Sequence, residues 1–147
     1  MTAPTTMEAL LVEELPEGPE WRYEPKWDGF RCIAVRSGGE VALWSRSGKP
    51  LGRYFPEVER LIAGLPGDEL ILDGELVIET AAGLSFDALS QRLHPAESRI
   101  RKLSADTPAQ FMAFDLLREG TEELSGLPLA TRRARLECLV RDAGAPA

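Results

Sequence analysis

The residues with the greatest capacity for chemistry lie in one short stretch, residues 26–31, which reads Lys-Trp-Asp-Gly-Phe-Arg. A lysine amine attacks a phosphorus or carbonyl centre only when it is unprotonated, which requires burial or a neighbouring cation. Lys26 has two aromatic residues and Arg31 beside it in sequence, so the stretch predicts a nucleophile that could attack a nucleotide α-phosphate. The same letters also fit a hairpin turn at Asp28-Gly29 with Lys26 and Arg31 as solvated flanks, because Asp-Gly is a strong hairpin dipeptide.

Carboxylates inside a strongly apolar run form a second candidate group. Residues 70–78 read Leu-Ile-Leu-Asp-Gly-Glu-Leu-Val-Ile. Asp73 and Glu75, together with Asp28, could supply hard oxygen ligands for Mg²⁺, which would stabilise the charge that develops at a phosphate under attack. By itself Asp73-Gly74-Glu75 favours a tight turn between two strands. The apolar residues on both sides favour a continuous strand instead, since a turn usually has more polar neighbours.

Three further residues permit two interpretations each. Phe114 fits either a core aromatic or an adenine-stacking ring, because periodicity does not distinguish the two. Arg46, in the Ser-Arg-Ser sequence of residues 45–47, fits either a solvated loop or a phosphate clamp. His94 is the only histidine, and its place beside a proline at a predicted helix end favours a structural role.

The secondary-structure signals mix strands and helices without a regular alternation. We expect a hairpin (31–35 and 41–44, with a turn at 37–40), helices at 54–62, 86–93, 96–104 and 129–140, and strands at 70–78 and 110–117. Ser85 is the expected N-cap of the second of these helices. This arrangement predicts the α+β class rather than a doubly wound sheet.

Bulk properties restrict the function classes. With 147 residues and 44% apolar side chains, one globular domain is expected. The two cysteines lack the spacing of a disulfide framework or zinc site, no apolar run reaches bilayer length, and the first residues do not read as a signal peptide, so we expect a cytoplasmic setting without membrane contact. The net charge of −7 argues against nucleic acid, but residues 22–60 hold eight bases against five acids.

The order of these stretches resembles the nucleotidyltransferase domain of ATP-dependent DNA ligases, most closely the bacterial accessory ligases associated with end joining. The resemblance covers about residues 23–117. Its four motifs are residues 26–31, 45–47, 72–76 and 111–115, in the order of the family. It implies an incomplete ATP-grasp-like fold with mainly antiparallel sheets and flanking helices.

Carried over residue by residue, the resemblance implies roles for seven side chains and a reaction with ATP, Mg²⁺ or Mn²⁺ and nicked double-stranded DNA in repair or recombination. Lys26 becomes adenylated, Asp28 takes part in metal or strand-joining chemistry, Glu24 reads adenine, Phe114 stacks on it, Arg31 contacts ribose and phosphate, Glu75 meets the ribose and the metal, and Arg46 holds the DNA 5′ phosphate.

The sequence also departs from the family. It contains no Glu-Gly-Val-Val motif, no Lys-x-Lys pair and no region that reads as an oligonucleotide-binding-fold domain, and its three lysines are Lys26, Lys49 and Lys102. We therefore expect residues 1–147 to be a partial adenylation domain that does not seal nicks alone. The alternatives are a split or truncated fragment that binds nucleotide or nicked DNA, with a second chain supplying the missing motifs, and an RNA ligase or capping-type nucleotidyltransferase.

Overall fold

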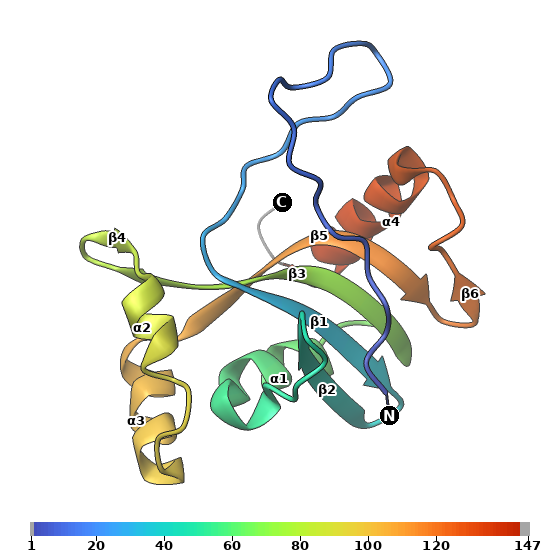
Figure 1. Cartoon of the computed structure of the whole chain (residues 1–147). Coiled ribbons are helices and arrows are strands. Elements are labelled where there is room, and N and C mark those ends of the chain that lie inside the picture. Colours follow the sequence, from blue (N-terminus) through green and yellow to red (C-terminus); the bar gives the residue numbers. More distant parts are fainter. Residues whose placement is uncertain (1, 145–147) are drawn as a thin grey trace.

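Strands and helices alternate irregularly along residues 2–144, the part of the chain that the computed structural model describes. The elements are β1 (Phe30–Ser37), β2 (Glu40–Ser45), a 3₁₀ turn η1 (Gly52–Tyr54), α1 (Pro56–Ala63), β3 (Glu69–Thr80), β4 (Gly83–Leu84), α2 (Phe86–Ser90), α3 (Glu97–Asp106), β5 (Ala109–Glu119), β6 (Glu122–Glu123) and α4 (Leu129–Asp142). The strands pair antiparallel in the order β2-β1-β3-β5-β6, with β4 on the far end of β3 (Figure 1). The α+β prediction is confirmed.

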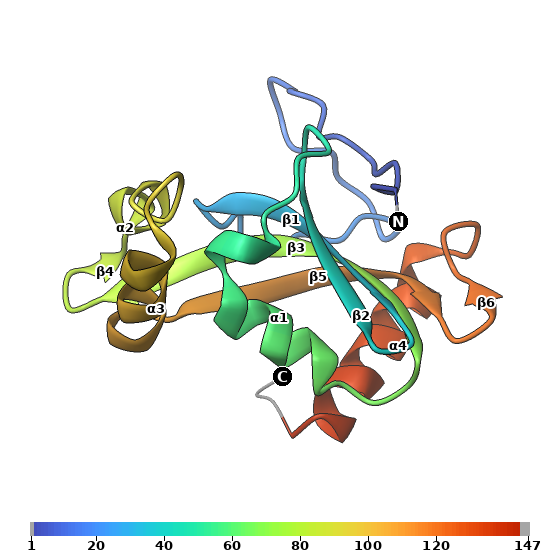
Figure 2. The same ribbon diagram turned by 90° about the horizontal axis from the view of Figure 1, so that it is seen from below.

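The two faces of this sheet have different surroundings. Along β3 the side chains alternate between the faces, so Leu72 and Leu76 enter the hydrophobic core while Asp73 and Glu75 point to the opposite face. Helices α1 and α4 cover the core face through Val58, Ile62, Leu136 and Leu139. Figure 2 shows α1 lying across this face. The alternation therefore separates the packing residues of β3 from its charged residues.

The predicted helices form, and local signals account for their starts. Helix α1 begins with Pro56 and has two glutamates in its first turn, both favourable at a helix N-terminus. The Ser85 hydroxyl accepts a hydrogen bond from the Ala88 amide at 3.1 Å, which confirms the predicted N-cap of α2. This helix ends at Ser90, three residues before the predicted end at 93.

The early end of α2 goes with the burial of Arg92, which is 0% exposed. Its guanidinium pairs with Glu57 of α1 at 2.5 Å, and Glu57 also accepts from the Ala109 amide at 3.1 Å. Arg92 donates further hydrogen bonds to the carbonyl oxygens of Tyr54, Leu103 and Thr107. One buried arginine therefore joins η1, α1, the end of α3 and, through Glu57, β5.

The N-terminal segment, residues 2–28, has no helix or strand and rises away from the sheet on the side opposite α1 (Figure 1). It carries seven exposed large apolar side chains, namely Met7, Leu10, Leu11, Val12, Leu15, Trp21 and Tyr23. Leu11 is 96% exposed, the highest value among them. Within residues 2–144, no helix has the length and apolar character that crossing a bilayer requires.

Candidate active site

Lys26 lies beside a pocket of about 460 Å³ that joins the stretch before β1 to β3 and α2. The pocket is lined by Lys26, Trp27, Asp28, Gly29, Glu75 and Phe86. Phe86 packs edge-to-face against Phe30, with the ring centroids 5.3 Å apart. No motif in the sequence singles out Phe86, because sequence pattern does not distinguish a core aromatic from one that lines a pocket. Lysine and carboxylates predicted from two separate stretches thus share one pocket.

Gly29 brings the lysine stretch close to β3. A Cβ atom at Gly29 would lie 2.0 Å from the Leu76 carbonyl oxygen, so the close approach of the two backbones requires glycine. Strand β1 begins at the next residue and pairs Phe30 with Leu76. The hairpin-turn interpretation of Asp28-Gly29 is therefore wrong, because the reversal of the chain occurs between β1 and β2.

Replacing Gly29 with alanine is expected to lower the free energy of unfolding by about 1–3 kcal/mol, because the added methyl group overpacks the backbone contact. Urea denaturation of the two chains measures this difference. Gly39→Ala is the matched control, since a Cβ there has nothing within 4 Å, and it should change stability by less than about 0.5 kcal/mol. Equal stabilities of the two variants would contradict the packing argument.

Arg31, Asp73 and Phe114 meet on the charged face of the sheet, next to the lysine pocket. The Arg31 guanidinium donates two hydrogen bonds to Asp73, at 2.8 Å from Nε and 2.6 Å from Nη2. Its Cζ lies 5.5 Å from the centroid of the Phe114 ring. The hydrogen bonds that Arg31 donates to Asp73 raise the pKa of Arg31 above its ordinary value. A bidentate partner fixes the plane of the guanidinium, so Asp73 orients Arg31.

A β-bulge accounts for the position of Phe114. On β5 the register pairs Asp73 with Asp115 but Gly74 with Ala113, which leaves Phe114 without a partner residue on β3. Such an extra residue bends a strand and re-aims side chains, here toward Arg31. The tight-turn interpretation of residues 73–75 is wrong, because they lie in the middle of β3 between β1 and β5.

Charges of both signs surround Glu75. Burial raises the pKa of its carboxyl, and the neighbouring carboxylates Asp73 and Asp28 act in the same direction, whereas the cations Arg31 and Lys26 oppose the shift. Lys26 itself is exposed, so burial, one of the two conditions named for a nucleophilic lysine, is not met by the described residues. A cation placed beside Glu75 would favour its ionised form.

The carboxylates fit a magnesium site in part. Asp28 and Glu75 line the same pocket, and Mg²⁺ is commonly held by one or two carboxylates together with substrate phosphates. Asp73, the third predicted ligand, is 3% exposed and both its oxygens accept hydrogen bonds from Arg31. Among residues 2–144 no three potential ligand side chains cluster closely enough to hold a metal without a substrate.

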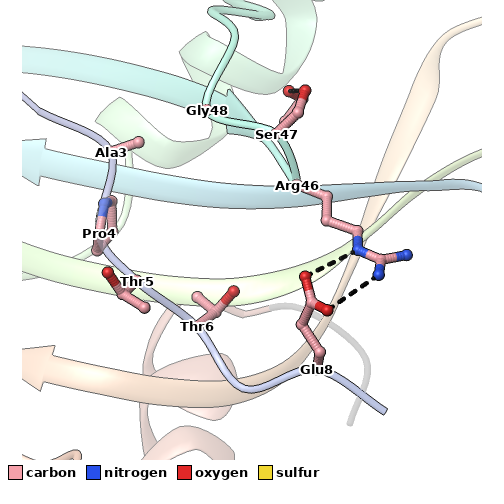
Figure 3. Close-up of a pocket in the computed structure, with 9 residues that line it drawn as sticks. Ala3, Pro4, Thr5, Thr6, Glu8, Arg46, Ser47 and Gly48 are labelled. Atoms are coloured by element: carbon pink, nitrogen blue, oxygen red, sulfur yellow. Dashed lines mark hydrogen bonds and ion pairs between the residues drawn. The ribbon is translucent and has the colours of Figure 1, made fainter. Parts of the chain in front are cut away.

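Two predicted site residues lie outside the lysine pocket. Glu24 is exposed, and its carboxylate lies 3.9 Å from Arg133 of α4. Arg46 follows β2 and lines a second pocket, where it pairs with Glu8 (Figure 3). The structure therefore brings Lys26, Asp28 and Glu75 together in one pocket. Glu24 and Arg46 lie outside this pocket.

The antiparallel sheet with its flanking helices is the fold of the nucleotidyltransferase domain of DNA ligases. The family model described as ATP dependent DNA ligase domain matches residues 4–146, and the chain belongs to that family.

Relatives that are named DNA ligases support this family assignment. The chain is 48% identical over 141 residues to DNA ligase C of Mycobacterium tuberculosis, covering 96% of this chain and 39% of that protein. It is 35% identical over 152 residues to the bifunctional non-homologous end joining protein LigD of Bacillus subtilis, covering 97% and 24%. The solved structure of mycobacterial DNA ligase D complexed with ATP and MES superposes with a TM-score of 0.61 at 30% identity, covering 83% and 37%. The chain thus spans about two fifths of the length of DNA ligase C.

Proposed function

We propose that this chain is the catalytic-lysine portion of an ATP-dependent DNA ligase, in which Lys26 carries an adenylyl group from ATP to a DNA 5′ phosphate. The observation that carries the proposal is the shared pocket of Lys26, Asp28 and Glu75, set beside the Arg31–Asp73 pair in a chain of the ligase family. The whole ligase reaction is part of the proposal, because the chain covers only part of its relatives.

In the first step the unprotonated Nζ of Lys26 attacks the α-phosphorus of ATP. A nitrogen–phosphorus bond forms, the bond to the bridging oxygen breaks, and pyrophosphate leaves with the electron pair while the amine loses its proton. The product is a lysyl phosphoramidate of AMP. Because Lys26 is exposed, bound ATP itself would have to exclude water from the amine in this chain.

In the second step a DNA 5′ phosphate oxygen attacks the same phosphorus, and the nitrogen–phosphorus bond breaks. The adenylyl group passes to the DNA, and Lys26 regains a proton. Arg31, held by Asp73, would bind the ribose and phosphate side of the nucleotide, and Phe114 beside it offers an aromatic face to adenine.

Mg²⁺ or Mn²⁺ would be held by Asp28 and Glu75 together with the ATP phosphates, and it would neutralise charge that develops at phosphorus. The mixed charge around Glu75 supports this placement, since a bound cation would offset the cost of keeping that carboxylate ionised.

Labelling with α-³²P nucleotides tests the proposal. The chain, incubated with Mg²⁺ and labelled ATP, is expected to become labelled in a denaturing gel, whereas labelled GTP should transfer little. Preferential labelling by GTP would favour the capping-type alternative. No label from either nucleotide, in Mg²⁺ or in Mn²⁺, would refute adenylyl transfer by this chain.

A fragment that binds nucleotide or nicked DNA without sealing it is the second candidate. It is favoured by the exposure of Lys26, whose amine is not shielded from water by the described residues. Under this reading a second polypeptide would complete the ligase. A nick-sealing assay separates the candidates, because joined product from the chain alone would exclude a binding-only role.

A further inference from the structure

The second pocket, of about 250 Å³, lies between the N-terminal segment and the turn that follows β2. One wall is residues 3–6 with Glu8, and the other is residues 45–48. Figure 3 shows the two walls facing each other, with Arg46 and Glu8 reaching across the gap. Hydroxyl groups from both walls line it, and the Ser45 and Ser47 oxygens lie 3.1 Å apart. A pocket built from one arginine and several hydroxyls suits an anion.

The anion at Arg46 in this structure is the carboxylate of Glu8. The interaction is bidentate: Arg46 Nε lies 3.3 Å from Glu8 Oε1, and Arg46 Nη2 lies 3.1 Å from Glu8 Oε2. The hydrogen bond from Arg46 lowers the pKa of Glu8, and the charge of Arg31 acts in the same direction. Two oxygens on a planar guanidinium are also the arrangement that a phosphate adopts with arginine.

The neighbouring residue fixes where Glu8 lies. Arg31 Nη2 donates to the Met7 carbonyl oxygen at 2.7 Å. Cys32, the residue after Arg31, pairs with Ser45, the residue before Arg46. Met7 and Glu8, which are consecutive in the N-terminal segment, therefore each bind an arginine. Met7 binds Arg31 next to the lysine pocket, and Glu8 binds Arg46 at the second pocket.

We infer that Glu8 is an internal competitor for phosphate, whose carboxylate occupies the place on Arg46 that the 5′ phosphate of a DNA nick takes. This inference rests on the proposed ligase function, with Arg46 in the phosphate-binding role that the family resemblance implies. The pair is exposed, at 65% for Arg46 and 62% for Glu8, so a dianionic phosphate can displace the carboxylate at small cost. An anion must therefore bind Arg46 more tightly than Glu8 does in order to displace it. This favours the more highly charged 5′ phosphate over single diester phosphates.

The test compares four variants for binding to nicked duplex DNA with either a 5′ phosphate or a 5′ hydroxyl, by fluorescence anisotropy at low salt. Glu8→Gln keeps the size of the side chain and removes its charge, and it should tighten binding of the 5′-phosphorylated nick by about 2–5-fold. Glu13→Gln makes the same change in net charge from an exposed site in the same segment and should change binding less than about 1.5-fold. The single variant Arg46→Ala and the double variant with Glu8→Gln complete a double-mutant cycle. In the Arg46→Ala background, Glu8→Gln should no longer tighten binding of the 5′-phosphorylated nick.

The inference is overturned if Glu8→Gln and Glu13→Gln tighten binding equally, or if the gain persists without Arg46. A second probe keeps it testable when DNA binding fails. Inorganic phosphate, titrated against the Arg46 Nε–H resonance in NMR, should bind Glu8→Gln more tightly than the native chain by a similar factor. Lack of any preference for the 5′-phosphorylated nick would count against the proposed function, whereas equal phosphate affinities in the titration would count against the role of Glu8.

Discussion

Replacing Lys26 with alanine is expected to abolish the adenylyl adduct, with labelling reduced by at least about 1000-fold. The reason is chemical: the covalent step needs the Lys26 amine, and the other two lysines, Lys49 and Lys102, are outside the lysine pocket. Intact-mass spectrometry after incubation with ATP and Mg²⁺ measures the adduct, and peptide mapping locates it.

Lys102→Ala is the matched control for Lys26→Ala. Lys102 is exposed on α3, and its loss makes the same change in composition and charge without touching the pocket. Its labelling should equal that of the native chain. An adduct that survives in Lys26→Ala would refute the assignment of the nucleophile, whatever its level in the control.

The second large effect concerns stability. Arg92→Met is expected to lower the free energy of unfolding by about 3–5 kcal/mol, because the variant leaves the Glu57 carboxylate without its charge partner in the core. Methionine keeps much of the side-chain volume, so a cavity does not explain the loss. Three carbonyl oxygens around Arg92 lose their donor as well. Urea denaturation, followed by circular dichroism, measures the change.

Arg101→Met controls for the loss of an arginine, since Arg101 is exposed on α3, and it should cost less than about 0.5 kcal/mol. Should Arg92→Met fail to fold, Glu57→Gln gives a milder variant in which the Ala109 amide can keep an oxygen acceptor. A cost below about 1 kcal/mol for Arg92→Met would show that the buried pair contributes little beyond its apolar equivalent.

Local elements could be predicted from sequence because their signals are local. The hairpin turn at residues 37–40, the proline that opens α1 and the Ser85 cap each act within a few residues, and all three form as predicted. Arg92 shows the limit of such signals. Its five hydrogen bonds reach residues 11 to 38 positions away, and no periodicity marks an arginine for burial.

The candidate site was predicted by residue type and motif order, and its geometry was not. Which strands pair, and therefore that Arg31 lies opposite Glu75, is a non-local property. The bulge that leaves Phe114 unpaired depends on the register between β3 and β5. The exposure of Lys26 and the attachment of Arg46 to Glu8 depend on the path of the N-terminal segment, which carries no secondary-structure signal.

The apolar side chains of the N-terminal segment have a consequence for colloidal behaviour. Seven of them are exposed to solvent, and exposed apolar side chains promote self-association unless charge opposes it. Near neutral pH the net charge of −7 provides that opposition, with five acids and no base in residues 1–21. Around the isoelectric point of about 4.8 the repulsion between molecules is lost while the apolar segment remains exposed. We therefore expect the carboxylates to keep this chain soluble near neutral pH. Mild acid, which neutralises them, is expected to lower its solubility.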